Sequence, residues 1–178
     1  MLFKLYRTSQ YQYTGQCDKY RKNAFNSCVN LKDVHLSAKL ESIEAGAFNN
    51  CESLSKIQLP STLKVLRGSA FSGTSLTEIN IPPQMKTEDY TAANRAWGGP
   101  FAGLTTLKKV TFDQGMEEIP RGIFYSPGSM LMLEEVVLPD SVKKSAIGHS
   151  VTADILKRSH CPKTWNLSMQ MHSGTVRI

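Results

Sequence analysis

Apolar side chains recur along the chain at a nearly constant spacing. Five phenylalanines are separated by 23, 23, 30 and 23 residues. Each is followed 5 to 9 residues later by an apolar residue, with two more lying three and five residues beyond it. These phenylalanines are Phe25, Phe48, Phe71, Phe101 and Phe124. A fixed period of about 20 to 50 residues is typical of stacked repeats, so we expect a solenoid.

The apolar triplets predict one short strand in every repeat. Apolar and polar residues alternate through them, which is the pattern of a parallel sheet with one buried face. Pro60, Pro82 and Pro139 directly follow three of these strands, where a missing backbone donor costs little. The predicted strands are Leu31–Leu36, Leu54–Leu59, Leu76–Ile81, Leu107–Phe112 and Leu133–Leu138.

A second apolar pair follows most strands and is expected to close each coil. The pairs are Leu40 with Ile43, Leu63 with Leu66, and Met116 with Ile119. One period before the first repeat, Tyr11 has the phase of Val34 and Tyr20 the phase of Ile43. We therefore predict one solenoid domain over 1–178, with a degenerate capping repeat over 1–23, five repeats over 24–142, an insertion near 87–100 and a carboxy-terminal cap over 143–178.

The repeat unit resembles that of the BspA-type leucine-rich-repeat family. Residues Ala47–Leu54 read alanine, phenylalanine, two asparagines, cysteine, glutamate, serine and leucine, and Ile57, Leu59 and Pro60 follow. The resemblance covers roughly residues 24–142. It implies a right-handed leucine-rich-repeat solenoid, mostly β to α/β in class. A parallel β-sheet is then expected on the concave face, with short irregular, strand or 3-10 segments on the convex face.

The resemblance also implies a function and a location. Solenoids mostly present surfaces, which favours a non-catalytic protein–protein interaction module. The family implies adhesion or binding at the surface of bacterial or protist cells, with host or matrix proteins as partners. We therefore expect a cell-surface or secreted protein, although the chain shows no signal peptide. An intracellular, cytoplasmic leucine-rich-repeat scaffold is the alternative.

The charge distribution disfavours nucleic acid as a partner. The net charge of +6 divides into +4 over residues 1–23, −3 over 24–142 and +5 over 143–178. A solenoid that binds nucleic acid is expected to concentrate basic residues along its working face. The sequence also has no run of 18 apolar residues, so we expect no membrane span.

Sequence motifs give no support to an enzyme, a cofactor site or a metal site. The chain has no phosphate-binding glycine loop, nucleophile elbow or metalloprotease motif. His149, His160, Cys161 and His172 lack the close pairing that zinc ligand sets usually show. We therefore predict no catalytic, cofactor-binding or metal-binding residues.

Two cysteines are expected to lie on neighbouring coils. Cys28 and Cys51 each follow the phenylalanine of their repeat by three residues. A buried free cysteine packs as a small apolar residue, which is the favoured interpretation. A disulfide between them in an oxidising compartment stays open, because the sequence cannot establish it.

The exposed residues of the strands provide the first candidate binding residues. They form two predicted ladders, and the charged ladder alternates in sign, so each charge should face opposite charges on neighbouring strands about 4.8 Å away. That arrangement sets strand register or forms a mixed-charge contact surface for protein. The charged ladder is Asp33, Lys56, Glu78, Lys109 and Glu135, and the polar ladder is His35, Gln58, Asn80, Thr111 and Val137.

The insertion in the third repeat provides the other candidates. Tyr90, Arg95 and Trp97 belong to the residue types that most often anchor protein interfaces. The alternative is that Tyr90 and Trp97 fold back over the stack. The strand face measures roughly 300 Å² from ideal strand spacing, whereas a stable interface needs about 800 Å² per partner. We therefore expect flanking loops or further repeats to complete the site.

Overall fold

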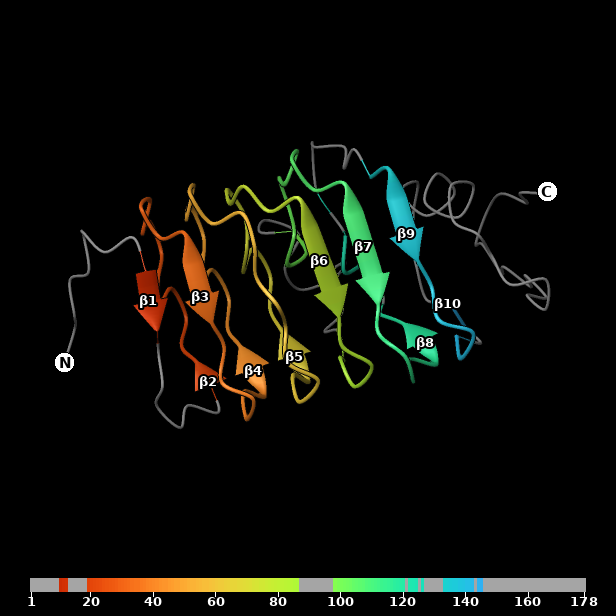
Figure 1. Ribbon diagram of the computed structural model, residues 1–178. Helices are drawn as coiled ribbons and strands as arrows, with labels where there is room; N and C mark the ends of the chain where they lie inside the picture. The colour runs from red at the N-terminus through yellow and green to blue at the C-terminus, as the bar shows by residue number, and fades with distance from the viewer. Residues whose placement is uncertain are drawn as a thin grey trace.

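A computed structural model describes residues 10–12, 19–86, 98–120, 122–124, 126, 133–142 and 144–145. Its described strands lie side by side in chain order, from the amino-terminal end to the carboxy-terminal end (Figure 1). Every strand pairing is parallel. The predicted cap over 143–178 lies outside the described residues, except for Lys144 and Ser145.

The longer strands form one row in the upper part of Figure 1. Two parallel sheets make up this row, in the orders β1-β3 and β6-β7-β9. The strand bounds are β1 Gln10–Gln12, β3 Asp33–His35, β6 Glu78–Ile81, β7 Lys109–Phe112 and β9 Glu135–Val137. Apart from β1, each lies within a predicted strand, so the prediction is confirmed at these four repeats.

The strand predicted over Leu54–Leu59 is wrong. This segment has no strand assignment and separates the β1-β3 sheet from the β6-β7-β9 sheet. The backbone N–H and C=O of Leu59 both bond to the side-chain amide of Asn80, at 2.8 and 2.9 Å. Because the Asn80 side chain hydrogen-bonds to the N–H and C=O of Leu59, these two backbone groups do not pair with a neighbouring strand.

A second row of short strands closes the coils. Parallel sheets in the orders β2-β4-β5 and β8-β10 form this row, at the lower edge of Figure 1. Tyr20 pairs with Ile43, Ile43 with Leu66, and Ser145 with Ile119. The pairing register thus continues to Ser145, beyond the boundary predicted at residue 142. The strands are β2 Lys19–Tyr20, β4 Ser42–Ile43, β5 Val65–Leu66, β8 Glu118–Ile119 and β10 Lys144–Ser145.

The register predicted for the capping coil, which precedes the first phenylalanine repeat, is confirmed. Tyr11 of β1 pairs with Val34 of β3, and Tyr20 of β2 pairs with Ile43 of β4. Each pair is separated by 23 residues, the period of the phenylalanines. The chain therefore begins stacking one coil before Phe25, the first phenylalanine of the repeat series.

The repeating phenylalanines form one continuous row through the core. Neighbouring ring centroids are 5.1, 5.3, 5.7 and 5.8 Å apart from Phe25 to Phe124. The rings of Phe48 and Phe71 are only 1° from parallel, and both side chains are fully buried. Tyr20 meets Phe25 edge-on at the amino-terminal end, and Phe112 meets Phe124 in the same way at the other end. Each coil therefore shares its core with its neighbours.

Hydrogen bonds between coils hold the phenylalanine segments in register. The backbone N–H of Phe25 donates to Ala47 at 2.7 Å, and Phe48 donates to Ala70 at 2.8 Å. After the longer third repeat, Phe71 donates to Pro100 at 2.9 Å. Residues 98–100, which the sequence assigned to the insertion, are buried in the fourth coil.

Candidate functional site: a groove on the strand face

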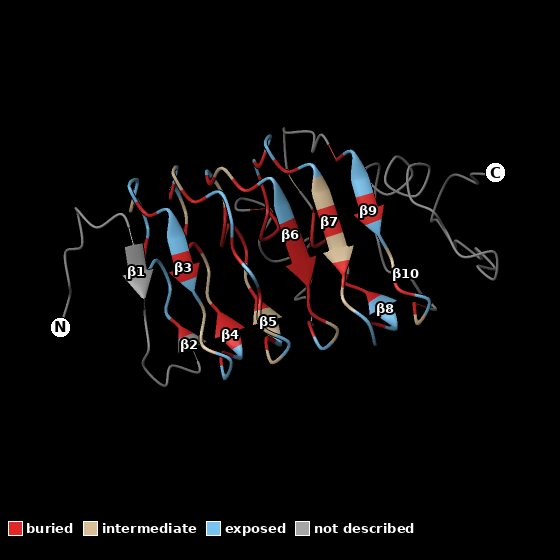
Figure 2. Cartoon of the chain, in the orientation of Figure 1, coloured by how far each residue is buried: buried red, intermediate tan, exposed pale blue. Residues whose placement is uncertain are grey.

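The strand face is the surface that carries the predicted charged and polar ladders. In Figure 2 the central residue of β3 and of β9 is buried between two exposed residues, while intermediate and buried residues alternate along β7. A groove of about 530 Å³ opens on this face. We call it the strand-face groove, and it is lined by Asp33, Val34, His35, Lys56, Ile57, Gln58, Glu78, Ile79, Asn80, Thr111 and Asp113.

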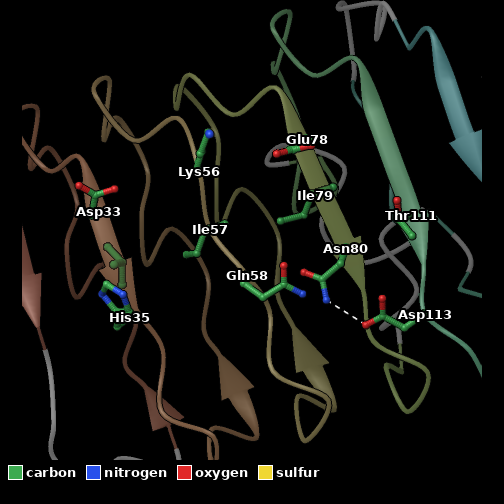
Figure 3. Close-up of a pocket in the computed structure, with 11 residues that line it drawn as sticks. Asp33, His35, Lys56, Ile57, Gln58, Glu78, Ile79, Asn80, Thr111 and Asp113 are labelled. Carbon is green, nitrogen blue, oxygen red and sulfur yellow. Dashed lines mark hydrogen bonds between the residues drawn. The ribbon is translucent and has the colours of Figure 1, made fainter.

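The groove lies where the row of long strands is interrupted. Lys56, Ile57 and Gln58 come from the segment without a strand, and they lie between β3 and β6 in Figure 3. β3 contributes Asp33 and His35 on one side, and β6 contributes Glu78 and Asn80 on the other. The fold therefore brings seven of the predicted binding residues into the groove, namely Asp33, His35, Lys56, Gln58, Glu78, Asn80 and Thr111.

Asn80 differs from the other members of its ladder because its side chain is buried, with 8% of the residue exposed. Its Nδ2 donates to the Leu59 carbonyl and to Asp113 Oδ2, both at 2.9 Å, and its Oδ1 accepts from the Leu59 N–H at 2.8 Å. The expectation of an exposed polar residue is wrong here. Asn80 connects the second and third coils, whereas the equivalent Gln58 in the preceding coil is exposed.

Charge pairing along the charged ladder is weaker than predicted. Lys109 Nζ lies 2.9 Å from Glu135 Oε1, so the last step of the ladder forms the expected ion pair. Among the described residues, no ion pair joins Asp33, Lys56 and Glu78, although they follow one another along the face. The predicted pairing is therefore wrong within the groove, and three charges there are left without an ionic partner.

Other coils carry ion pairs that the two ladders do not include. Lys64 pairs with Glu41 at 2.6 Å and Arg67 with Glu44 at 2.6 Å, each across 23 residues. These pairs lie beside the second row of strands. The side chains of Lys64 and Glu41 are 47% and 48% exposed and those of Arg67 and Glu44 are 37% and 32% exposed, so water screens both pairs and each contributes little to stability.

Asp113 is a groove residue that the sequence did not suggest. It follows β7 directly, and its Oδ2 accepts a hydrogen bond of 2.9 Å from Asn80 Nδ2, which is the dashed line in Figure 3. The ladders were defined by residues inside the strands, so a carboxylate one position beyond β7 was missed. A search for polar residues immediately after the strands would have found Asp113.

The groove offers charge and hydrogen bonding for a polar ligand. It combines the carboxylates of Asp33, Glu78 and Asp113 with the ammonium of Lys56 and the imidazole of His35. In the described part of the chain, His35 forms no hydrogen bond to a hydroxyl or thiol that it would activate as a nucleophile. Within the same residues, no group of three or more His, Cys, Asp or Glu side chains has an arrangement suited to a metal ion.

Cys28 and Cys51, the cysteines in the described residues, form no disulfide with each other. Cys51 is fully buried, and its Sγ donates to the Phe25 carbonyl at 3.1 Å. Burial raises the pKa of the Cys51 thiol to about 12, and the neighbouring Cys28 adds to the increase. Burial also raises the pKa of Cys28, which is half-buried. Both cysteines therefore lie on adjacent coils as protonated packing residues at neutral pH.

The insertion candidates Tyr90, Arg95 and Trp97 lie outside the described residues. Lys109 and Glu135 are on the strand face beyond the groove and bind each other.

In the segments that the structure describes, no helix is long and apolar enough to cross a bilayer.

The repeat register and the phenylalanine row agree with a match to a known family. Residues 18–151 match six copies of the BspA type leucine-rich repeat region. The chain belongs to this family. Repeat folds of this kind typically present binding surfaces. No curated protein matches the chain.

Solved structures of bacterial leucine-rich-repeat proteins resemble the chain in fold. The pneumococcal vaccine antigen PcpA is 23% identical, with a TM-score of 0.59 over 86% of this chain and 40% of its own. A leucine-rich-repeat protein from T. pallidum is 19% identical, with a TM-score of 0.50 over 84% and 82%. A third, from Bacteroides ovatus ATCC 8483, is 19% identical with a TM-score of 0.49 over 78% and 41%. The chain spans about two-fifths of the first and third of these proteins.

Proposed function

We propose that this chain is a non-catalytic protein-interaction module that binds its partner through the strand face. The repeats then form a right-handed leucine-rich-repeat solenoid with this face on the concave side. We further propose that the module acts in adhesion or cell-surface binding, with a host or matrix protein as partner. Membership of the BspA-type leucine-rich-repeat family supports a surface location.

The groove in the strand face is the observation that carries this proposal. It exposes the amide of Gln58 and several charged side chains at a place where the strand row is interrupted. In the described residues, Asp33, Lys56 and Glu78 form no ion pair. Such groups bind well when a partner supplies complementary charges and hydrogen bonds. Because the strand face is small, the proposed interface includes flanking loops, and Tyr90, Arg95 and Trp97 remain candidates for this part.

A matched pair of substitutions tests the proposed surface. Gln58 and Gln84 are both exposed, but Gln58 lies in the groove whereas Gln84 lies in the turn after β6. We expect Gln58→Trp to fill the groove and abolish capture of a partner from host matrix or cell extracts. Gln84→Trp should leave capture unchanged. Equal capture by both variants, with unchanged melting temperatures, would show that the partner binds elsewhere.

The alternative function is an intracellular scaffold that uses the same surface. Cys28 and Cys51 lie on neighbouring coils with no disulfide between them, which suits a reducing compartment. Fractionation of the native cells distinguishes the two proposals. A surface protein should be removed by protease added to intact cells, and a cytoplasmic scaffold should be protected until the cells are lysed.

A further inference from the structure

We infer that the strand-face groove accepts a basic, extended protein segment, with the carboxylates of Asp33, Glu78 and Asp113 as its acceptors. This inference rests on the proposed function, because it names the chemistry of the partner at the same surface. It concerns the sign of the charge in the groove and the spacing of the groups that carry it.

The groove is acidic, although the chain as a whole is basic. It holds three carboxylates against one ammonium, that of Lys56, whereas the complete sequence has a net charge of +6. In the described part of the chain, none of these carboxylates forms an ion pair. Asp113 accepts a hydrogen bond from the Asn80 amide through Oδ2 alone. A partner that brings two or more cations therefore complements the groove.

The carboxylates are spread across several coils, which matches an extended ligand. Asp33 lies on β3 and Glu78 on β6, with one coil between them, and Asp113 follows β7. With coils about 4.8 Å apart, Asp33 and Glu78 are separated by roughly 10 Å along the row. An extended segment advances about 3.3 Å per residue, so cationic residues on one side of it, two or four positions apart, are separated by about 7 or 13 Å and bracket this distance. A compact cation satisfies only one carboxylate.

Lys56 limits which segments bind. It lies between Asp33 and Glu78 in Figure 3 and repels a cation that approaches either of them. Replacing it by a neutral residue should therefore improve binding of a basic segment. The same replacement should weaken binding of an acidic segment, so Lys56→Gln reports the sign of the ligand directly.

Short synthetic peptides test the inference with the full-length chain. Fluorescence anisotropy compares a peptide of alternating lysine and threonine with counterparts that carry glutamate or glutamine in place of lysine. We expect the lysine peptide to bind and the other two to bind more weakly. The repeats over residues 24–142 carry a net charge of −3, whereas the chain as a whole carries +6, so single substitutions, and not the overall charge, show whether the groove carboxylates are responsible.

Neutral substitutions then locate the binding. Each of three neutral substitutions should weaken the affinity for the lysine peptide about 1.5- to 5-fold, which is the range for exposed ion pairs. They are Asp33→Asn, Glu78→Gln and Asp113→Asn. Glu118→Gln, on β8 in the other strand row, is the matched control and should have no effect. Lys56→Gln should strengthen binding by a similar factor. Raising the ionic strength should weaken binding, because salt screens exposed charges.

The outcomes separate this inference from the proposed function. If the triple carboxylate variant binds the lysine peptide as tightly as the wild type, the inference is wrong. It is also wrong if no peptide binds, or if the glutamate peptide binds in a manner that Lys56→Gln abolishes. In these cases, loss of partner capture by Gln58→Trp still supports the strand face as the interface, whereas unchanged capture rejects the proposed function itself.

Discussion

The amide of Asn80 should stabilise the fold far more than its place on an exposed ladder suggests. Asn80→Leu preserves the approximate size of the side chain but removes three hydrogen bonds. The N–H and C=O of Leu59, a residue with 1% exposure, lose their partners. Each buried group without a partner costs about 1–3 kcal/mol, which gives a gross loss of about 2–6 kcal/mol.

A buried leucine recovers part of that loss. Burying its extra apolar surface returns about 1–2 kcal/mol, so the middle values of the two ranges give an expected net loss of about 2.5 kcal/mol. Gln58→Leu is the matched control, because Gln58 has the same ladder position one coil earlier and is exposed. It should change stability by less than about 0.5 kcal/mol.

Two measurements check the prediction for Asn80. Urea denaturation gives the change in the free energy of unfolding, and hydrogen exchange reports the protection of the Leu59 amide. Asn80→Leu should lower both, whereas Gln58→Leu should lower neither. If Asn80→Leu unfolds like the wild type and Leu59 remains protected, the amide does not hold the second and third coils together.

Three further predictions concern the stack itself. Gly73→Ala should lower the melting temperature more than Gly103→Ala does. The two glycines have similar φ angles, +70° at Gly73 and +75° at Gly103, so the backbone strain of an alanine is similar at both. An added Cβ at Gly73 would lie 2.5 Å from Asn50 Oδ1, whereas the nearest atom to an added Cβ at Gly103 is 3.5 Å away. Equal losses would mean that only the backbone conformation matters. Phe48→Leu should cost about 1.5–4.5 kcal/mol in lost ring contacts with Tyr20, Phe25 and Phe71, whereas Phe112→Leu loses a single described ring contact and should cost about 0.5–1.5 kcal/mol. Cys51, with a pKa of about 12, should resist alkylation by iodoacetamide at pH 8 until the protein unfolds. Because its pKa is higher in the folded than in the unfolded chain, the stability that the protonated thiol contributes should be complete below about pH 8.5 and should decrease as the pH rises towards 12. Rapid alkylation of Cys51 in the native protein would contradict its burial.

The periodic apolar residues predicted most of the fold because their burial decides the register. Phe48 and Phe71 recur with the same period that pairs Ile43 with Leu66. A change of register by one residue would turn these side chains towards water. For the same reason, the weak signal of Tyr11 at the phase of Val34 was sufficient to predict their pairing.

The interruption at Leu54–Leu59 was not predictable from that pattern. Its alternation of apolar and polar residues equals that of the repeats that do form strands. At the end of the segment, the side chain of Asn80, 21 residues later, bonds to the backbone N–H and C=O of Leu59. A sequence pattern specifies which residues face inward, but it does not specify whether a buried amide replaces a backbone partner.

The candidate site was predicted in part. The ladders placed Lys56 and Gln58 on the strand face correctly, because alternation alone decides which side of a coil a residue occupies. They did not predict a groove, since its position depends on the interrupted strand. The predicted ion pairs inside the groove failed because pairing requires two long side chains to meet, and matching positions on adjacent coils do not ensure contact.

Site-specific photo-crosslinking tests the central claim most directly, namely that the strand face is the binding surface. A photoreactive amino acid replaces Gln58 in one variant and Gln84 in another, and each is mixed with the captured partner. The account predicts a crosslinked complex from position 58 and none from position 84. Crosslinking from position 84 alone would contradict it.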